Sequence, residues 1–157
     1  MHPNIALIER FYSCFKVLDG DGMAQCYHDQ IEFSDPVFPA LKGSKAGAMW
    51  KMLCSQARGF DLVFSEAQAD DAAGTAHWEA TYVFSATGRN VHNRIDASFR
   101  FQDGKIIQHR DSFSFWRWSS MALGPVGMLL GWSPLVKNKV RRQAAQNLER
   151  FIQKSAA

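Results

Sequence analysis

The chain has 157 residues, 46% hydrophobic and 21% charged, which is enough apolar material for one core and too little length for two ordinary domains. This charge content argues against intrinsic disorder, and an odd number of scattered cysteines indicates a reducing compartment rather than a disulfide framework. Two charged residues, Glu9 and Arg10, interrupt the apolar N-terminal stretch, which is not the pattern of a signal peptide. We therefore expect one domain over 1–157 and a cytoplasmic location.

The net charge of +3 is unevenly distributed along the chain. Residues 137–154 hold six lysines and arginines against one acidic residue, so the rest of the chain carries 12 basic and 14 acidic residues. A basic helix of this kind could contact nucleic acid or anionic lipid. Such helices are more often solvent-exposed faces, and we expect no nucleic-acid partner.

The first part of the chain shows helical periodicity. Apolar residues recur every three or four positions from Pro3 to Leu18, which predicts an amphipathic helix that ends at the Asp-Gly-Asp-Gly run at 19–22. A short helix is predicted over 23–30. A second long helix is predicted from Ser44, which would be its N-cap residue.

From residue 61 the apolar period changes to two, which is typical of strands. Two Gly-containing pairs, Thr87-Gly88 and Asp103-Gly104, are hairpin signals between them. Strands are predicted over 61–68, 75–88, 89–101 and 106–118. Helices followed by an antiparallel sheet predict an α+β fold in one domain.

The C-terminal part differs in character from the predicted meander. Residues 119–134 are apolar and rich in Gly and Pro, so we expect a loop there. The spacing of apolar residues from Val136 to Ile152 predicts a last amphipathic helix.

A carboxylate lies in an apolar, proline-stiffened segment, FSDPVFPALKG, at 33–43. Asp35 precedes Pro36, and aspartate before proline is common where a strand ends, because proline favours extended geometry in its neighbour. The carboxylate can also accept hydrogen bonds from nearby backbone N–H groups. Taken alone, the segment favours a turn over a catalytic site.

Two ionisable residues lie on the apolar face of the strand at 106–118. Alternation places His109 and Asp111 on the same side as Phe113 and Phe115, which marks that side as buried. A buried carboxylate needs a partner or a shifted pKa, because desolvation of an ion is costly. The pair is either a structural ion pair or part of a functional site.

The neighbouring strands alternate in the same way. In the strand at 89–101, Asn93 and Ile95 share the apolar face, and Asn93 is the polar group that could reach a pocket. In the strand at 75–88, His77 and Glu79 lie on one face and aromatic residues lie on the other. Periodicity alone does not decide which face lines a ligand cavity and which contacts a helix or a second subunit.

The order of these elements resembles the nuclear transport factor 2-like superfamily, which includes ketosteroid isomerases, limonene epoxide hydrolases and SnoaL-like polyketide cyclases. The resemblance covers about residues 4–118, with a strand that ends in aromatic-x-Asp-Pro and a curved meander. It implies a cone-shaped fold, in which a curved antiparallel sheet wraps around the N-terminal helices and encloses a deep pocket. Residues 119–157 would add an apolar cap or dimer contact and an extra C-terminal helix.

The resemblance also assigns roles to residues. FSDPVFPALKG resembles the segment that carries the isomerase general base, which places that role on Asp35. The first-helix tyrosine of the isomerases falls nearest Phe11, with Tyr12 one residue away and expected to point elsewhere. Their oxyanion-hole aspartate falls at about Ala97, so ketosteroid isomerase activity itself is not expected.

The epoxide hydrolases and cyclases suggest a second set of roles. GKIIQHRDSFSFW resembles the hydrolase strand that carries an Arg-Asp-aromatic-Phe run, and the matching aspartate is Asp111. With a one-residue gap, His77 and Glu79 fall where the hydrolase Arg-x-Asp pair lies, and moving the gap would swap the strand face. The hydrolase's water-holding Tyr and Asn correspond to Phe33 and Asp35. SnoaL-like cyclases also use an aspartate near Asp111.

We therefore expect an acid/base enzyme, either an isomerase, a cyclase or an epoxide hydrolase, that uses no cofactor or metal. Its substrate would be a small hydrophobic molecule with one oxygen function. The candidate catalytic residues are Asp35, Asp111, His77 and Glu79. The candidate substrate-binding residues would line an apolar pocket: Phe11, Phe15, Phe33, Trp50, Asn93, Ile95, His109 and Phe113.

Other functions stay open at this stage. The pocket could hold a hydrophobic ligand without chemistry, or the apolar stretch at 121–136 could form a homodimer scaffold, and a homodimer is expected. His109-x-Asp111 and His77-x-Glu79 could also supply metal ligands. The 121–136 stretch is too short and too interrupted by Gly and Pro for a membrane span.

Overall fold

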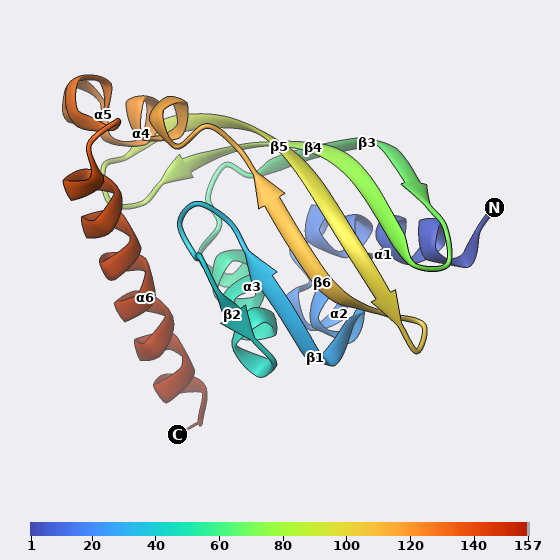
Figure 1. The fold of residues 1–157 in the computed structure, drawn as a ribbon. Coiled ribbons are helices and arrows are strands. Elements are labelled where there is room, and N and C mark those ends of the chain that lie inside the picture. Colours follow the sequence, from blue (N-terminus) through green and yellow to red (C-terminus); the bar gives the residue numbers. More distant parts are fainter. Residues whose placement is uncertain (157) are drawn as a thin grey trace.

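The computed structural model describes residues 1–156, in which a curved, unclosed six-stranded sheet wraps around three N-terminal helices (Figure 1). The elements run in the order α1 (Pro3–Lys16), α2 (Gly20–Gln25), β1 (Tyr27–Ser34), β2 (Leu41–Lys42), α3 (Ser44–Gln56), β3 (Asp61–Ala69), β4 (Ala73–Phe84), β5 (Arg89–Gln102), β6 (Lys105–Ser112), α4 (Phe115–Leu123), α5 (Pro125–Leu130) and α6 (Pro134–Ala156). The predicted α+β class, the curved sheet and the extra C-terminal helix are confirmed.

The strands have the order β2-β1-β6-β5-β4-β3, and neighbours are antiparallel except for the parallel pair β1 and β6. That pair joins the end of the meander to the strand that leads into the Asp35 segment: Phe33 lies opposite His109, and Ser34 lies opposite Arg110. The parallel pairing therefore brings two segments more than 70 residues apart in sequence to the same place.

The predicted short second helix is present, but its predicted bounds, 23–30, are wrong. Helix α2 begins earlier, because the carboxylate of Asp19 accepts a hydrogen bond from the N–H of Gly22 at 2.9 Å and caps the helix. Helix α2 ends at Gln25, and β1 begins at Tyr27. The Asp-Gly run therefore ends one helix and begins the next.

The loop predicted over 119–134 is also wrong, because α4 and α5 occupy most of it. Strand β6 ends at Ser112, and Ser114 caps α4 by accepting a hydrogen bond from the N–H of Arg117 at 3.2 Å. Gly124 links α4 to α5 with a φ of +68°, which favours glycine. A Cβ at Gly127 would overlap the backbone of Ser119, so this glycine allows close packing of the two helices.

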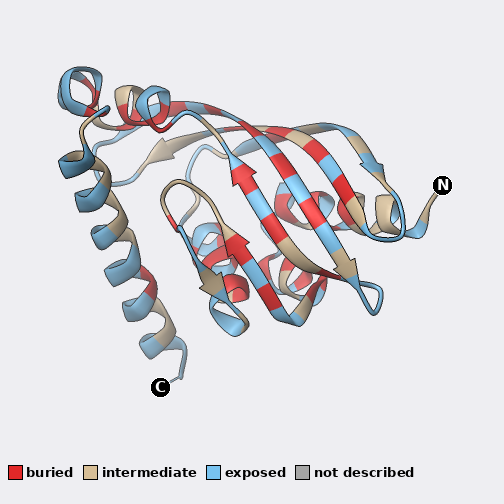
Figure 2. Ribbon diagram, viewed as in Figure 1, coloured by how far each residue is buried: buried red, intermediate tan, exposed pale blue. Residues whose placement is uncertain are grey.

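Alternating burial along the long strands places one sheet face against the helices (Figure 2). Along β5 the inward residues Val91, Ile95 and Phe99 are buried and their neighbours are exposed, as the alternation predicts. Helix α6 packs through Leu148 on the same core, and Lys45 of α3 pairs with Glu149 at 3.1 Å. No helix within residues 1–156 has the length and apolar character to cross a bilayer.

Candidate functional site

Asp35 lies in a tight turn directly after β1. Its Oδ1 accepts hydrogen bonds from the backbone N–H groups of Val37 at 2.7 Å and Phe38 at 2.6 Å. Its own N–H donates to the carbonyl of Phe38 at 2.9 Å. Arg141 of α6 donates from Nε to the carbonyl of Pro36 at 2.8 Å. The turn expected from the sequence is present, and it fixes the direction of the carboxyl group.

The environment of Asp35 opposes its ionisation. Burial raises the pKa of Asp35 to about 7, and the negative charge of Asp111 adds to the increase. The two N–H bonds and the Arg141 charge act in the opposite direction and are outweighed. The carboxyl group therefore exchanges its proton near neutral pH, which is the range that suits a general acid or base.

Asp111 lies on the inner face of β6 with 3% of its surface exposed. Its Oδ1 accepts hydrogen bonds from His109 Nε2 at 2.9 Å and from Trp78 Nε1 at 3.3 Å. The buried His109–Asp111 pair predicted from the alternation is confirmed. The second donor to the Asp111 carboxylate, Trp78, belongs to a different strand, β4.

The hydrogen bonds continue from His109 into the core. His109 Nδ1 lies 2.7 Å from the hydroxyl of Tyr27, and Trp50 Nε1 donates to the same oxygen at 2.7 Å. Burial raises the pKa of Tyr27 well above its usual range, so its hydroxyl keeps its proton. A neutral His109 that accepts from Tyr27 at Nδ1 and donates to Asp111 at Nε2 satisfies every group in this chain.

Asp35 and Asp111 line one open hollow of about 430 Å³ at the ends of β1 and β6. Within residues 1–156, the hydrogen bonds to both carboxyl groups go to Oδ1, which leaves each Oδ2 free for a bound molecule. Half-buried Phe113 also faces the hollow. The complete lining is Ser34, Asp35, Pro36, Pro39, Arg110, Asp111, Ser112 and Phe113.

Most of the aromatic residues predicted to line a pocket fill the interior instead. Phe11, Phe15, Phe33 and Trp50 are at most 4% exposed, and their rings pack on one another with centroid distances of 5.1 Å for Phe15–Trp50 and 5.4 Å for Phe33–Trp50. Ile95 is buried among them. These five residues belong to the buried core and do not line the hollow.

The two polar residues among the predicted substrate contacts are also placed away from the hollow. His109 is fully buried, with both ring nitrogens bonded within the protein, so it positions Asp111 and does not face a ligand. Asn93 lies on the inner face of β5 with 8% of its surface exposed and does not line the hollow. Phe113 is the one predicted substrate-binding residue that does.

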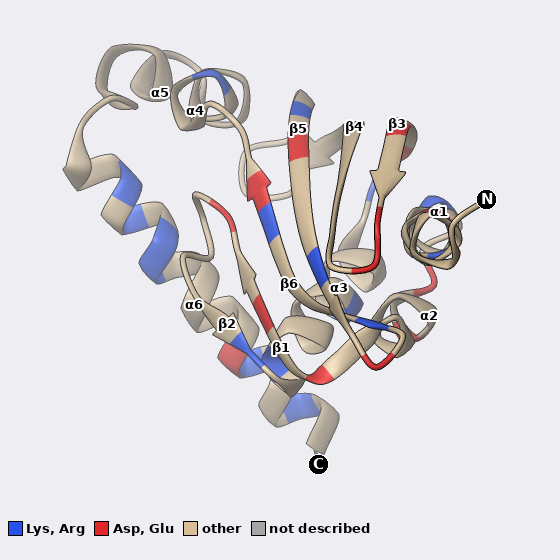
Figure 3. Ribbon diagram, turned by 45° about the vertical axis from the view of Figure 1, so that its right-hand side comes forward, with Lys and Arg blue, Asp and Glu red and all other residues tan. Residues whose placement is uncertain are grey.

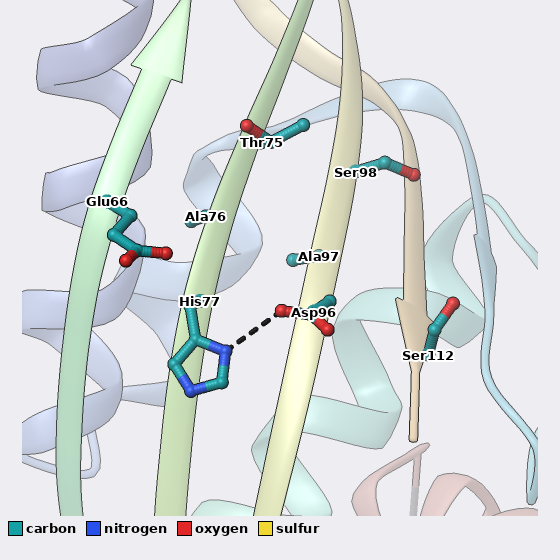
Figure 4. Close-up of a pocket in the computed structure, with 8 residues that line it drawn as sticks. All are labelled: Glu66, Thr75, Ala76, His77, Asp96, Ala97, Ser98 and Ser112. Carbon is teal, nitrogen blue, oxygen red and sulfur yellow. Dashed lines mark hydrogen bonds and ion pairs between the residues drawn. The ribbon is translucent and has the colours of Figure 1, made fainter. Parts of the chain in front are cut away.

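His77 and Glu79 lie on the outer sheet face, so the prediction that they share a cavity with Asp111 is wrong. Trp78 between them points inward to Asp111, and successive strand residues face opposite ways. His77 Nδ1 bonds to Asp96 at 2.9 Å, as Figure 4 shows, and His77 Nε2 bonds to Glu79 at 3.0 Å. Hydrogen bonds to Asp96 and Glu79 raise the pKa of His77. These residues form a surface ion-pair network.

Two tyrosines that were not among the predicted site residues lie near the carboxyl groups. Tyr12 points into the core, contrary to expectation, and its hydroxyl is the one buried side-chain polar atom of residues 1–156 without a hydrogen-bond partner. Burial and the Asp111 charge raise its pKa well above the usual range. Tyr82 accepts a hydrogen bond from Trp118 Nε1 at 2.8 Å, and burial raises its pKa to about 12. The alternation with Trp78 and Ala80 already places Tyr82 on the inner face.

Potential metal ligands do not cluster in the part of the chain that the structure describes. Within residues 1–156, no three His, Cys, Asp or Glu side chains are grouped so that they could hold a metal ion.

Solved structures with this fold have low sequence identity to the chain. An LEH-like epoxide hydrolase from M. tuberculosis is 21% identical with a TM-score of 0.63, over 85% of this chain and 95% of its own. A protein described as a SnoaL-like polyketide cyclase from Jannaschia sp. CCS1 is 13% identical with a TM-score of 0.68. The match covers 78% of this chain and 93% of that protein. A protein with a ketosteroid isomerase-like fold from Catenulispora acidiphila DSM 44928, solved in complex with trimethylamine, is 9% identical with a TM-score of 0.67. The match covers 80% of this chain and 96% of that protein.

Sequence comparison identifies the family. A comparison with curated protein sequences gives no match. A family model described as a SnoaL-like domain matches residues 8–109, which is more than half of the chain and includes β1, β4, β5 and most of β6. The resemblance to the nuclear transport factor 2-like superfamily is thereby confirmed, and the chain belongs to the SnoaL-like domain family.

Proposed function

We propose that the protein is a cofactor-independent acid/base enzyme for a small hydrophobic molecule that carries one oxygen function. The observation that supports this proposal is the shared hollow of Asp35 and Asp111, in which each carboxyl group keeps a free Oδ2. Two carboxyl groups in different environments can divide the roles of acid and base between them. His77 and Glu79 have no part in this proposal.

The proton positions follow from the hydrogen bonds. Asp111, which accepts from His109 and Trp78, is the base that removes a proton from a C–H group or from a water molecule. Asp35, with a pKa of about 7, is the acid that donates its proton to the substrate oxygen. Negative charge on the oxygen is thereby neutralised as it forms. The proton on Asp111 then passes to the product or to solvent, and Asp35 takes up a proton from the product oxygen or from solvent, which restores both groups.

The walls of the hollow favour a small and largely apolar substrate. Pro36, Pro39 and Phe113 supply apolar surface beside the two carboxyl groups, and about 430 Å³ is within the range of small-molecule sites. The names of the epoxide hydrolase and polyketide cyclase neighbours support the same class of chemistry. Epoxide opening, cyclisation and isomerisation all require one group that takes a proton and one that gives a proton to oxygen.

A substrate panel with two readouts tests the proposal. Cyclic terpene epoxides in ¹⁸O-labelled water report epoxide opening, and enolisable cyclic ketones in D₂O report C–H proton exchange, both measured by mass spectrometry. On a substrate that is turned over, Asp35→Asn and Asp111→Asn should each lower kcat by roughly 10²–10⁴-fold, the usual contribution of a positioned acid or base. Glu79→Gln is the matched control on the outer sheet face and should stay within about twofold of the wild type.

Full activity in both aspartate variants would show that this assignment is wrong. A bound molecule without a reactive centre, found by native mass spectrometry in a protein that turns over none of the panel, would favour a ligand-binding function instead. A loss of activity in Glu79→Gln equal to that in Asp111→Asn would show that residues of the outer sheet face take part in catalysis.

A further inference from the structure

An exposed apolar surface lies at the turn from α5 into α6. It consists of six side chains that are 49% to 81% exposed and fall within ten residues: Val126, Met128, Leu129, Leu130, Trp132 and Leu135. They are half of the twelve exposed large hydrophobic side chains of residues 1–156. We call this surface the apolar tip. Contiguous exposed apolar surface of this kind marks an interaction site more often than an ordinary solvent-exposed face.

The apolar tip is held in a fixed shape by its own hydrogen bonds. The indole N–H groups of Trp116 and Trp132 donate to the carbonyls of Met128 at 3.1 Å and Leu129 at 2.8 Å. Behind the tip, Phe115, Trp118 and Ala122 form a buried cluster on the end of the sheet. The structure therefore presents these side chains to the outside on a packed support, and they are not the surface of an unstructured loop.

The charged residues that flank the apolar tip in the sequence are of one sign. Residues 118–136 contain no charged side chain, Arg117 precedes them, and Lys137, Lys139, Arg141 and Arg142 follow. Figure 3 shows the uncharged end of the molecule with positive residues on α4 and on the adjoining half of α6. Arg117, Lys139 and Arg142 are exposed and make no ion pair within residues 1–156. The first acidic residue along α6 is Glu149, which is paired with Lys45.

We propose that the apolar tip inserts into the surface of an anionic lipid bilayer, with Arg117, Lys139 and Arg142 against the headgroups. Exposed Leu, Met and Trp side chains bordered by basic residues are the composition of interfacial membrane anchors. Anionic headgroups complement the basic border. A second copy fits less well, because symmetric contact between two tips would bring the two basic borders together without an acidic counterpart.

Vesicle co-sedimentation of the full chain tests this proposal. The probes are large unilamellar vesicles of phosphatidylcholine alone and of phosphatidylcholine with 30% phosphatidylglycerol, at 50 mM and 500 mM NaCl. We expect binding to the anionic vesicles at low salt, weaker binding at high salt and little binding to phosphatidylcholine alone. A blue shift of tryptophan emission on binding, absent in Trp132→Phe, would place Trp132 in the lipid.

Two pairs of variants separate the tip from general effects of sequence change. Lys139→Glu should weaken binding by about 25-fold, since each of the two units of charge contributes about fivefold, and Lys16→Glu on α1 should not. Leu129→Glu should weaken binding by at least about tenfold, because one buried apolar side chain is lost. Val63→Glu, at an equally exposed apolar site on the outer sheet face, should leave binding unchanged.

Three results would overturn the proposal: no binding to anionic vesicles, equal binding by both members of each variant pair, or a concentration-dependent dimer that Leu129→Glu dissociates without any lipid binding. The last result would assign the tip to a contact between copies. The readout needs no substrate, so it is independent of the proposed acid/base chemistry.

Discussion

Asp35 and Asp70 make the same backbone hydrogen bonds in different environments. Asp70 Oδ1 accepts from the N–H groups of Ala72 and Ala73, both at 2.8 Å, as Asp35 Oδ1 does from Val37 and Phe38. Asp70 is at the surface, where these bonds lower its pKa. At Asp35 burial outweighs them, and the pKa rises from 3.8 to about 7. The two residues therefore predict opposite effects of pH on stability.

The size of the effect at Asp35 follows from the pKa difference between the folded and unfolded states. Between pH 4 and pH 7 the folded protein holds a proton on Asp35 that the unfolded chain has lost, so stability falls as the pH rises. About three pH units at 1.36 kcal/mol each give a cost of at most about 4 kcal/mol above pH 7. Asp35→Asn removes this cost, and its side-chain oxygen can still accept the two N–H bonds.

The measurement is urea unfolding of the wild type and Asp35→Asn at intervals from pH 4 to pH 8.5. Relative to its value at pH 4, the variant's stability advantage should grow steadily through pH 7 and then level off. The matched control is Asp70→Asn, for which the sign is reversed. Because the folded-state pKa of Asp70 is lowered, Asp70 stabilises the fold above its unfolded pKa, and this contribution is lost only in acid. The variant should therefore be less stable than the wild type by an amount that stays nearly constant from about pH 5 to pH 8.5, where the Asp35→Asn difference still changes.

A difference between the wild type and Asp35→Asn that does not change with pH would refute this reasoning. A variant that loses relative stability as the pH rises would refute it more strongly. It would mean that the N–H bonds and Arg141 favour the carboxylate more than burial disfavours it.

Three further predictions concern the site and its support. Arg141→Gln removes a charge that lowers the pKa of Asp35. Activity that needs protonated Asp35 should therefore persist to higher pH in the pH–rate profile of the variant. An unchanged profile would contradict this role of Arg141. Tyr27→Phe removes the hydroxyl that bonds to His109, and should cost about 1–3 kcal/mol in urea unfolding and lower kcat more than it raises KM. Gly127→Ala should lower the melting temperature, because overpacking against Ser119 costs about 1–3 kcal/mol, whereas Ala substitution at exposed Ser155 should have little effect.

The sequence predicted features that depend on local periodicity. The inward position of Asp111 follows from its spacing to Phe113, and the turn at Asp35 follows from the chemistry of Asp-Pro. The face of His77 could not be settled in this way, because a period of two gives two alternating sets without saying which one is inside. A one-residue gap in the resemblance then placed His77 and Glu79 on the wrong side of β4.

The remaining errors come from long-range packing. The hydrogen bond between Tyr27 and His109 joins residues 82 positions apart and depends on the parallel pairing of β1 with β6. Tyr12 is buried because the sheet covers a broad face of α1, wider than a single apolar stripe suggests. The glycines at 127 and 131 suggested a loop, yet they allow the α5 segment to pack closely on Ser119 of α4.

The chain of hydrogen bonds behind Asp111 ends at a group that cannot pass a proton on. It runs through His109 and Tyr27 to the indole of Trp50, and an indole N–H donates but does not accept. Under the proposed chemistry, a proton that Asp111 takes up therefore has no exit through the core. It must leave through the hollow, by way of the product, Asp35 or solvent, so the turnover rate would depend on how freely that opening exchanges water and product.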